Sequence, residues 1–267
     1  MHERPPFPRI NMLSPLAKGL VFAQLGGGAG SSGMVDSSIY GNHATLTNME
    51  PATDWVWDST LRRWWLNYDG VDDYAIATRN PPSCLNAITI ACWINIVAYP
   101  AGDASPRLVD WYPAPSLYRT GDNRVGWYGN IGGISRDYPI SYAIGSLTDS
   151  QKHIAVTYDG ITTLVYINGV LDNTLTTYSG ALSAPSNTFC VAGRSTDTDR
   201  CLTGYVGDVL VFDRAVPAAM IAALADPSNL MLKCGGSSLI APFPRRMWSI
   251  ARTGNRRRRL IICGSAA

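Results

Sequence analysis

The stretch YDGITTLVYINGV, residues 158–170, constrains the fold more than any other part of the chain. It holds two turn-forming pairs, Asp159-Gly160 and Asn168-Gly169, and both pairs accept the positive φ angles of a tight type I′ turn. The residues between the two pairs are mostly β-branched or aromatic, which favours a strand. A chain that reverses twice around one short strand is expected to form an antiparallel meander, with strands at residues 153–158, 163–167 and 170–176.

Alternating apolar residues predict strands elsewhere in the chain. From Ile88 to Ile96 every second residue is isoleucine or cysteine, which is the period-two pattern of a strand with a buried face. Gly, Asp or Asn separate the remaining strand candidates, which are residues 63–68, 73–78, 107–111, 124–128, 188–193 and 204–212. One helix is expected, with Pro217 at its first position and an Ala-rich segment following to Leu224. The pattern predicts an all-β, two-sheet antiparallel sandwich with one short C-terminal helix.

Composition divides the chain into three parts. We expect an extended, Pro-rich N-terminal arm at residues 1–17, the sandwich at 18–230 and a basic tail at 231–267. The tail has eight basic residues and no acidic one, whereas residues 1–230 hold 14 basic and 20 acidic residues, a formal charge of −6. This split predicts that the tail binds an acidic surface, on its own chain or on a neighbour, and a merely solvated tail is the alternative. The tail residues expected to make the contact are Arg245, Arg246, Trp248, Arg256, Arg257, Arg258 and Arg259.

The sequence gives no sign of a membrane segment or of disulfide bonding. No apolar run reaches the roughly 18 residues that span a bilayer, and prolines occupy the N-terminal region where a signal peptide has its apolar segment. The six cysteines have no metal-finger spacing, and we expect free thiols, with Cys190 and Cys201 as the pair that could join on oxidation.

Several segments resemble a known family. NYDGVDDYAIAT, AITIACWINI, KHIAVTYDGITTLVYINGVL, FCVAGR and GYVGDVLVFDRAVPAAMIAAL follow one another in the order seen in laminin-G-like jelly-roll domains of the concanavalin A-like lectin/glucanase superfamily. The resemblance covers residues 18 to about 226. It implies a jelly-roll sandwich, but it says little about function because such folds serve many tasks.

The resemblance also implies a candidate metal site. Members of the family often hold a structural Ca²⁺ near an Asp-rich loop and a late acidic position, and the matching residues here are Asp36 and Asp208. Calcium takes six to eight oxygen ligands, so two aspartates could supply part of a site. The alternative is that Asp36 caps its own turn through a side-chain hydrogen bond. Apart from this Ca²⁺, no cofactor is expected.

The superfamily includes glucanases, but the sequence argues against an enzyme. Retaining glycosidases need two carboxyl groups about 5–5.5 Å apart, and the glucanase pattern Glu-x-Asp-x-x-Glu places them on one strand. This chain has only two glutamates, Glu3 and Glu50, and neither lies in that pattern. Phosphate-loop, nucleophile-elbow and zinc-protease motifs are also absent from the sequence.

The sequence favours binding or assembly instead. Aromatic rings stack on sugar faces and anchor protein interfaces, and Trp111, Tyr112, Trp127 and Tyr128 are the candidates for a carbohydrate or partner contact. The terminal arms and the character of the tail resemble structural proteins of tailed phages. We therefore expect a virion protein, of the capsid-decoration or fibre type, that assembles in the host cytoplasm with itself and with other virion proteins. A free carbohydrate-binding lectin is the alternative, and nucleic-acid binding through the arginine block is not favoured because the block has no reading surface.

Overall fold

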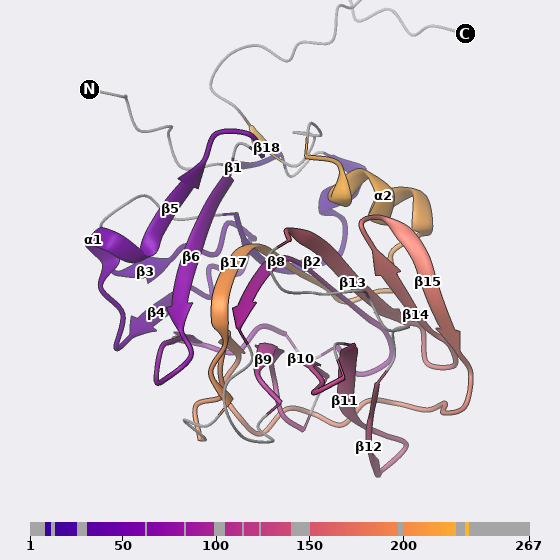
Figure 1. Ribbon diagram of the computed structural model, residues 1–267. Coiled ribbons are helices and arrows are strands. Elements are labelled where there is room, and N and C mark those ends of the chain that lie inside the picture. Colours follow the sequence, from indigo (N-terminus) through magenta and orange to yellow (C-terminus); the bar gives the residue numbers. More distant parts are fainter. Residues whose placement is uncertain are drawn as a thin grey trace, which may run out of the picture. The chain divides into compact units, whose positions relative to one another are not determined.

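The computed structural model describes residues 9–11, 14–25, 31–61, 63–82, 84–98, 105–113, 115–122, 124–139, 150–196, 200–227 and 233–234 (Figure 1). Two antiparallel sheets form a sandwich, which confirms the predicted fold class. Sheet I has the strand order β15-β14-β13-β8-β17-β6-β5, and β2 also pairs with β17. Sheet II has the order β12-β11-β10-β9-β16-β7-β4-β3, and a separate two-stranded sheet joins β1 to β18.

The elements have the following bounds. Sheet I contains β2 (Leu20–Gln24), β5 (Trp55–Asp58), β6 (Arg63–Asp69), β8 (Ile88–Ala98), β13 (Lys152–Tyr158), β14 (Thr163–Ile167), β15 (Val170–Leu175) and β17 (Thr203–Phe212). Sheet II contains β3 (Gly33–Met34), β4 (Ala44–Thr47), β7 (Tyr74–Ala77), β9 (Arg107–Asp110), β10 (Ser116–Arg119), β11 (Val125–Ile131), β12 (Ile134–Pro139) and β16 (Cys190–Val191). The other elements are β1 (Arg9–Ile10), β18 (Lys233–Cys234), a 3-10 helix (Pro15–Ala17), α1 (Pro51–Asp54) and α2 (Ala218–Ala225).

The predicted meander is present as β13-β14-β15, but its two turns differ. Asn168 and Gly169 both have positive φ, 50° and 80°, as a type I′ turn requires. At the other end, Tyr158 pairs with Thr163, so the connection has four residues, and of these only Gly160 has a positive φ. The Asp159 carboxylate accepts from the amides of Ile161 and Thr162 at 2.9 and 2.7 Å, and these bonds stabilise the longer turn.

The core lies between the inner faces of the two sheets. β8 contributes Ile88, Ile90, Cys92, Ile94 and Ile96, the alternating set on which the strand was predicted. Sheet II contributes an opposing set that includes Leu117, Val125, Trp127 and Val191. Removing a buried Leu, Ile or aromatic side chain from such a core costs about 2–5 kcal/mol.

A second apolar cluster covers the outer face of sheet I. Register places Ala91, Ala155 and Tyr166 in one row across β8, β13 and β14, and all three belong to this cluster. The small alanines leave room for the covering residues, which include Leu16 from the 3-10 helix and Ile221 from α2. Residues 15–17 are thus packed helix, not extended arm as the sequence predicted, because Leu16 and Ala17 bury apolar surface here.

The chain forms two units, residues 1–236 and 237–267, and the second unit lies outside the described residues. The predicted contact residues of the tail therefore lie outside the described part, namely Arg245, Arg246, Trp248, Arg256, Arg257, Arg258 and Arg259. Among the described residues, no helix combines the length and apolar character needed to cross a membrane. The structure describes four buried cysteines that are not in disulfides, Cys84, Cys92, Cys190 and Cys201, so Cys190 and Cys201 are not joined to each other.

Candidate functional site

The four aromatic residues expected at a contact surface fall into two pairs. Trp111 and Trp127 are 1% and 0% exposed and belong to the core between the sheets, so the expectation that they form a contact surface is wrong. Their indole rings supply large apolar area, which favours burial wherever a strand turns them inward. Tyr112 and Tyr128 are partly exposed and remain candidates for contact.

Tyr112 and Tyr128 stack against each other. Their ring centroids are 5.2 Å apart and their planes differ by 23°. Tyr128 lies in β11, and Tyr112 lies in the β9–β10 connection, where its carbonyl accepts from the amides of Ser186 and Asn187 at 3.2 and 2.9 Å. A hydrogen bond between the two hydroxyl groups raises the pKa of Tyr112. The pair is therefore a fixed aromatic surface, which we call the tyrosine pair.

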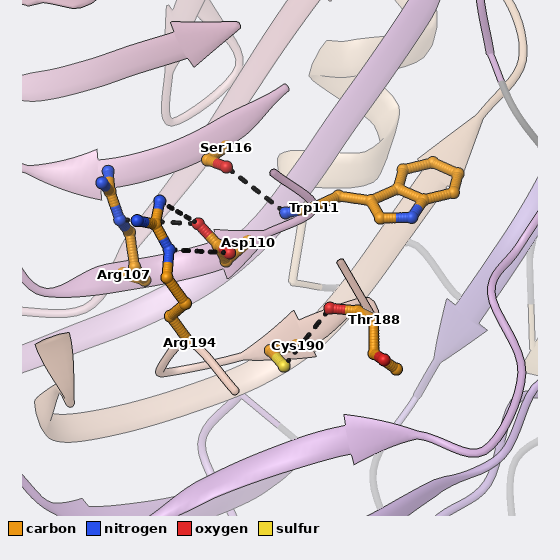
Figure 2. Close-up of polar contacts among 7 residues, drawn as sticks. All are labelled: Arg107, Asp110, Trp111, Ser116, Thr188, Cys190 and Arg194. Atoms are coloured by element: carbon orange, nitrogen blue, oxygen red, sulfur yellow. Dashed lines mark hydrogen bonds and ion pairs between the residues drawn. The ribbon is translucent and has the colours of Figure 1, made fainter. Parts of the chain in front are cut away.

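A buried carboxylate, that of Asp110 in sheet II, contacts two arginines (Figure 2). Asp110 at the end of β9 is fully buried, and Arg194 donates to both of its oxygens, from Nε at 3.1 Å and from Nη2 at 3.0 Å. Arg107, at the start of β9, has its Nε 3.5 Å from the same carboxylate. The Arg194 guanidinium carbon is also 4.8 Å from the ring centre of Tyr112. Arg194 thus connects Asp110 to the tyrosine pair, and cation–π attraction favours this contact.

Arg107 is held by a second tyrosine. Its guanidinium carbon lies 4.7 Å from the ring centre of Tyr118 in β10. The ring of Tyr118 lies over Gly126 of β11, where an added Cβ would be only 2.1 Å from the ring. Burial, followed by the positive charges of Arg194 and Arg200, lowers the pKa of Arg107 to about 10, while the charge of Asp110 acts in the opposite direction. We call Arg107, Asp110, Arg194 and the tyrosine pair the arginine–tyrosine site.

Cys190 of β16 lies opposite Asp110 in strand register. Its Sγ donates to the carbonyl of Thr188 at 3.5 Å (Figure 2). Burial, together with the negative charge of Asp110, raises the pKa of the thiol to about 12. The thiol is therefore protonated near neutral pH and is a packing residue of the site, not a nucleophile.

The two predicted calcium ligands each have protein partners. Asp36 accepts from the amides of Ala23, Ser38 and Asn42 at 2.9, 2.9 and 2.7 Å, and from the Ser38 hydroxyl at 2.8 Å. Its bonds to Ser38, two residues on, are those of a capped turn, the alternative that the sequence left open. Asp208 faces Arg63 at 3.3 Å. The binding of Ca²⁺ by these two residues stays a prediction.

A third acidic group was not predicted from the sequence as a metal site. Asp69, Asp72 and Asp73 have carboxylate oxygens within 4.8 Å of one another, and within the described ranges no other His, Cys, Asp and Glu residues form such a group. Burial raises the pKa of Asp73 to about 6, and the charge of Asp69 acts in the same direction. The DGVDD sequence at residues 69–73 is the signal that could have suggested it. Asp69 and Asp73 also accept backbone amides of the same turn, so the group stabilises that turn.

The outer face of sheet I holds another arginine with its own counter-charge. Arg63 of β6 lies 3.3 Å from Asp208 of β17, and its guanidinium carbon is 4.1 Å from the ring centre of Trp93 in β8. His153 of β13 meets the Trp93 ring edge-on at 5.4 Å. Burial, followed by the charge of Arg63, lowers the pKa of His153 to about 3. The imidazole is therefore neutral at ordinary pH and packs as a structural residue.

Comparison with known proteins places the chain in a family. Residues 69–222 match the family model described as the concanavalin A-like lectin/glucanases superfamily, which is more than half of the chain. The chain belongs to this superfamily. The predicted resemblance is thus confirmed for the fold. A search of curated proteins found no match.

Solved structures with the same superfamily fold include several toxin binding domains. The binding domain of botulinum neurotoxin serotype D is 13% identical with a TM-score of 0.57, over 78% of this chain and 52% of that one. The binding domain of Paraclostridial Mosquitocidal Protein 1 is 14% identical with a TM-score of 0.59, over 79% and 52% of the two chains. The receptor-binding domain of the botulinum neurotoxin mosaic serotype C/D is 14% identical with a TM-score of 0.60, over 79% and 51%.

The chain spans about half the length of these solved structures. At such low identity the likeness shows a common fold and no more. All three structures are described as binding or receptor-binding domains, and none is described as a glucanase.

Proposed function

We propose that this protein is a non-enzymatic, carbohydrate-binding module whose contact surface includes the tyrosine pair. The observation that carries the proposal is the stacked and partly exposed arrangement of Tyr112 and Tyr128, 5.2 Å apart, on a lectin-type sandwich. Tyrosine presents a rigid apolar face with a polar tip, which suits a sugar ring with its apolar face and its hydroxyl groups. The scarcity of glutamate and the lack of a glucanase carboxylate pattern in the sequence support a role in binding without hydrolysis.

A glycan array followed by affinity measurements tests this proposal. We expect the wild-type protein to bind at least one glycan class and Tyr112→Ala or Tyr128→Ala to weaken that binding about five- to tenfold, since each ring contributes about 1–1.5 kcal/mol. Tyr40→Ala is the matched control, because Tyr40 is 46% exposed on a loop outside the site. An array without any hit, or site variants that bind like the wild type, would overturn the proposal.

A second observation favours a role in particle assembly. β1 pairs with β18, so that Arg9 and Ile10 lie opposite Cys234 and Lys233, and the segments before and after the sandwich start from one place. In Figure 1 this two-stranded sheet lies at the top of the view, whereas β11 and β12, beside the tyrosine pair, lie at the bottom. We propose that the module is displayed on a virion, anchored through its arms to neighbouring subunits, while its far end binds a surface glycan.

Deletion of residues 235–267 tests the virion role. We expect the truncated protein to keep the melting temperature of the full chain and to lose incorporation into particles or homo-oligomers, measured by mass analysis of purified particles and by light scattering. A particle preparation that never contains the full-length protein, together with a monomeric full chain, would overturn this second proposal and leave the lectin proposal standing. A truncated chain that no longer folds would show that the tail is needed by the sandwich itself.

A further inference from the structure

The arginine–tyrosine site has a hydrogen-bond donor without an acceptor. Arg107 is 4% exposed, and its Nη1 is buried and makes no hydrogen bond. Its Nε approaches Asp110 at 3.5 Å but also lacks a hydrogen bond of good geometry. A buried donor without an acceptor is destabilising, and more so when it is charged, so this guanidinium offers a position for an acceptor group of a ligand.

The charges around Arg107 point to the kind of ligand. Arg194 and Arg200 are close enough to lower the pKa of Arg107, and Asp110 is the carboxylate that acts against them. Both oxygens of Asp110 already accept from Arg194. The groups acting on Arg107 thus carry more positive than negative charge, and the oxygens of its nearest carboxylate are in use. An additional group with acceptor oxygens and a negative charge would improve both the hydrogen bonding and the charge balance.

The position of the arginines relative to the tyrosines narrows the ligand class. Arg194 contacts Asp110 with one edge and the ring of Tyr112 with its face, so its guanidinium lies directly beside the tyrosine pair, and Arg107, which approaches the same carboxylate, lies against Tyr118. A bound molecule that stacks on the tyrosines would carry any group projecting from its ring toward Arg194 and Arg107. This arrangement matches a sugar ring with an acidic substituent.

We infer that the arginine–tyrosine site binds acidic glycans, with a sugar ring on the tyrosine pair and its carboxylate or sulfate held by the guanidinium groups of Arg107 and Arg194. The inference rests on the proposed function and specifies the ligand. A planar carboxylate fits the two parallel N–H groups of a guanidinium, whereas a sulfate presents three oxygens to both arginines. Lysine would not replace either arginine, because an ammonium group lacks the paired donors and the flat face.

The test uses polymers that differ only in charge. If the site binds a carboxylate, we expect polygalacturonate to bind at least tenfold more tightly than its carboxyl-reduced form. If the site binds a sulfate, we expect dextran sulfate to bind at least tenfold more tightly than dextran. The tighter binding of the acidic polymer should weaken only modestly as salt is raised, because Arg107 and Arg194 are buried and screening acts mainly on exposed charge pairs. Equal binding of the charged and neutral forms would overturn the acidic-ligand inference and leave the proposed function intact. If the protein binds none of these polymers and no glycan on the array, both the acidic-ligand inference and the proposed carbohydrate-binding function are wrong.

Two variants locate the charge effect in this site. Arg107→Lys keeps the positive charge and loses the paired donors, and we expect it to reduce the preference for the acidic polymer about tenfold. Arg79→Gln removes an exposed arginine elsewhere and should leave the preference unchanged within about twofold. An Arg107→Lys protein that melts like the wild type but keeps the full preference would contradict the inference. If that variant fails to fold, the comparison of charged and neutral polymers with wild-type protein still decides the question.

Discussion

The two outer faces of the sandwich each bury an arginine beside an aspartate, but the charges around them differ. On sheet I, Arg63 faces Asp208 at 3.3 Å, and the charged residues that act on its pKa, Asp208 and Asp58, are both acids. On sheet II, the residues that act on Arg107 include two arginines and Asp110. In both places burial lowers the pKa of the arginine, so desolvation is common to the two and the charge balance distinguishes them.

The difference separates a structural pair from a candidate binding site. The negative charge that Arg63 needs comes from the chain itself, and the rest of that outer face is covered by the apolar cluster that holds Leu16 and Ile221. The negative charge near Arg107 is shared with Arg194, and the tyrosine pair beside it is partly exposed. A buried ion pair seldom adds net stability. At Arg63 the ion pair fixes the geometry, whereas at Arg107 two arginines share one carboxylate, so the charges that act on Arg107 are not balanced.

Removing each aspartate is the strongest test of this comparison. We expect Asp110→Asn to lower the free energy of unfolding by about 3–5 kcal/mol, because it leaves two buried guanidinium groups without their carboxylate. Asp208→Asn should cost less, since the Asp208 side chain is 11% exposed, against 0% for that of Asp110, and Asp58 also acts on Arg63. Denaturant titration of the two variants gives both values. A larger loss for Asp208→Asn would show that Arg63, and not Arg107, depends more strongly on its aspartate.

The pH dependence of stability tests the sheet I side. His153 has a folded pKa of about 3, below the unfolded value of about 6.5, so the unfolded chain binds the proton first. The stabilising difference is therefore complete above pH 6.5 and is lost as the pH falls toward 3, with a total on the order of 5 kcal/mol. His153→Gln should flatten the stability profile in this window. Denaturant midpoints measured from pH 7 to pH 4 provide the comparison, and parallel profiles would contradict a neutral, buried imidazole.

Asp73 offers an internal contrast in the same pH window. Its folded pKa, about 6, lies above its ordinary value of 3.8, so its contribution is complete below pH 3.8 and is lost as the pH rises toward 6. Asp73 thus makes the free energy of unfolding fall as the pH rises, whereas His153 makes it rise, and Asp73→Asn should abolish the first of these two changes. Because Asp73 and His153 lie in different parts of sheet I and its turns, their effects should add in the double variant.

Gly126 tests whether Tyr118 positions Arg107 on sheet II. An added Cβ would lie 2.1 Å from the Tyr118 ring, so Gly126→Ala must displace that ring and should cost about 1–3 kcal/mol. Gly133→Ala is a suitable control, because Gly133 has a φ of +80° and no atom within 4 Å, and backbone strain alone costs about 1 kcal/mol. We also expect Gly126→Ala, and not Gly133→Ala, to weaken the preference for acidic polymers. Equal effects of the two variants would show that Tyr118 has no positioning role.

The sequence predicted the strands of the core better than it predicted the site. The alternation through Ile88–Ile96 located β8, because one buried face imposes period two on the residues. β10 was missed, since Ser-Leu-Tyr-Arg is short and all four residues are buried, so no alternation is visible. Trp111 and Tyr112 are neighbours in the sequence, yet one points into the core and the other outward. Composition alone could not distinguish them.

The arginine–tyrosine site depends on contacts that only the fold creates. Asp110 and Arg194 are 84 residues apart in the chain, and β16 brings them together by pairing with β9. The importance of Gly126 follows from the Tyr118 ring on the next strand, which a single sequence does not reveal. The contact of Asp208 with Arg63 and that of Asp36 with the Ala23 amide likewise join separate parts of the chain, whereas the bonds of Asp36 to Ser38 are local and match the capped turn that the sequence left open as an alternative.

The smallest expected effect concerns the hydroxyl of Tyr112. Tyr112→Phe keeps the ring that stacks on Tyr128 and contacts Arg194, and removes the hydrogen bond between the two hydroxyl groups. We expect a change of less than about 1 kcal/mol in the free energy of unfolding and less than about threefold in glycan affinity, because water replaces a partly exposed hydrogen bond. Calorimetric titration of Tyr112→Phe and Tyr112→Ala with the glycan separates the contribution of the ring from that of the hydroxyl. A Tyr112→Phe protein that binds as weakly as Tyr112→Ala would mean that the hydroxyl, and not the stacked face, recognises the ligand, and the sugar would then have to approach the pair from its edge.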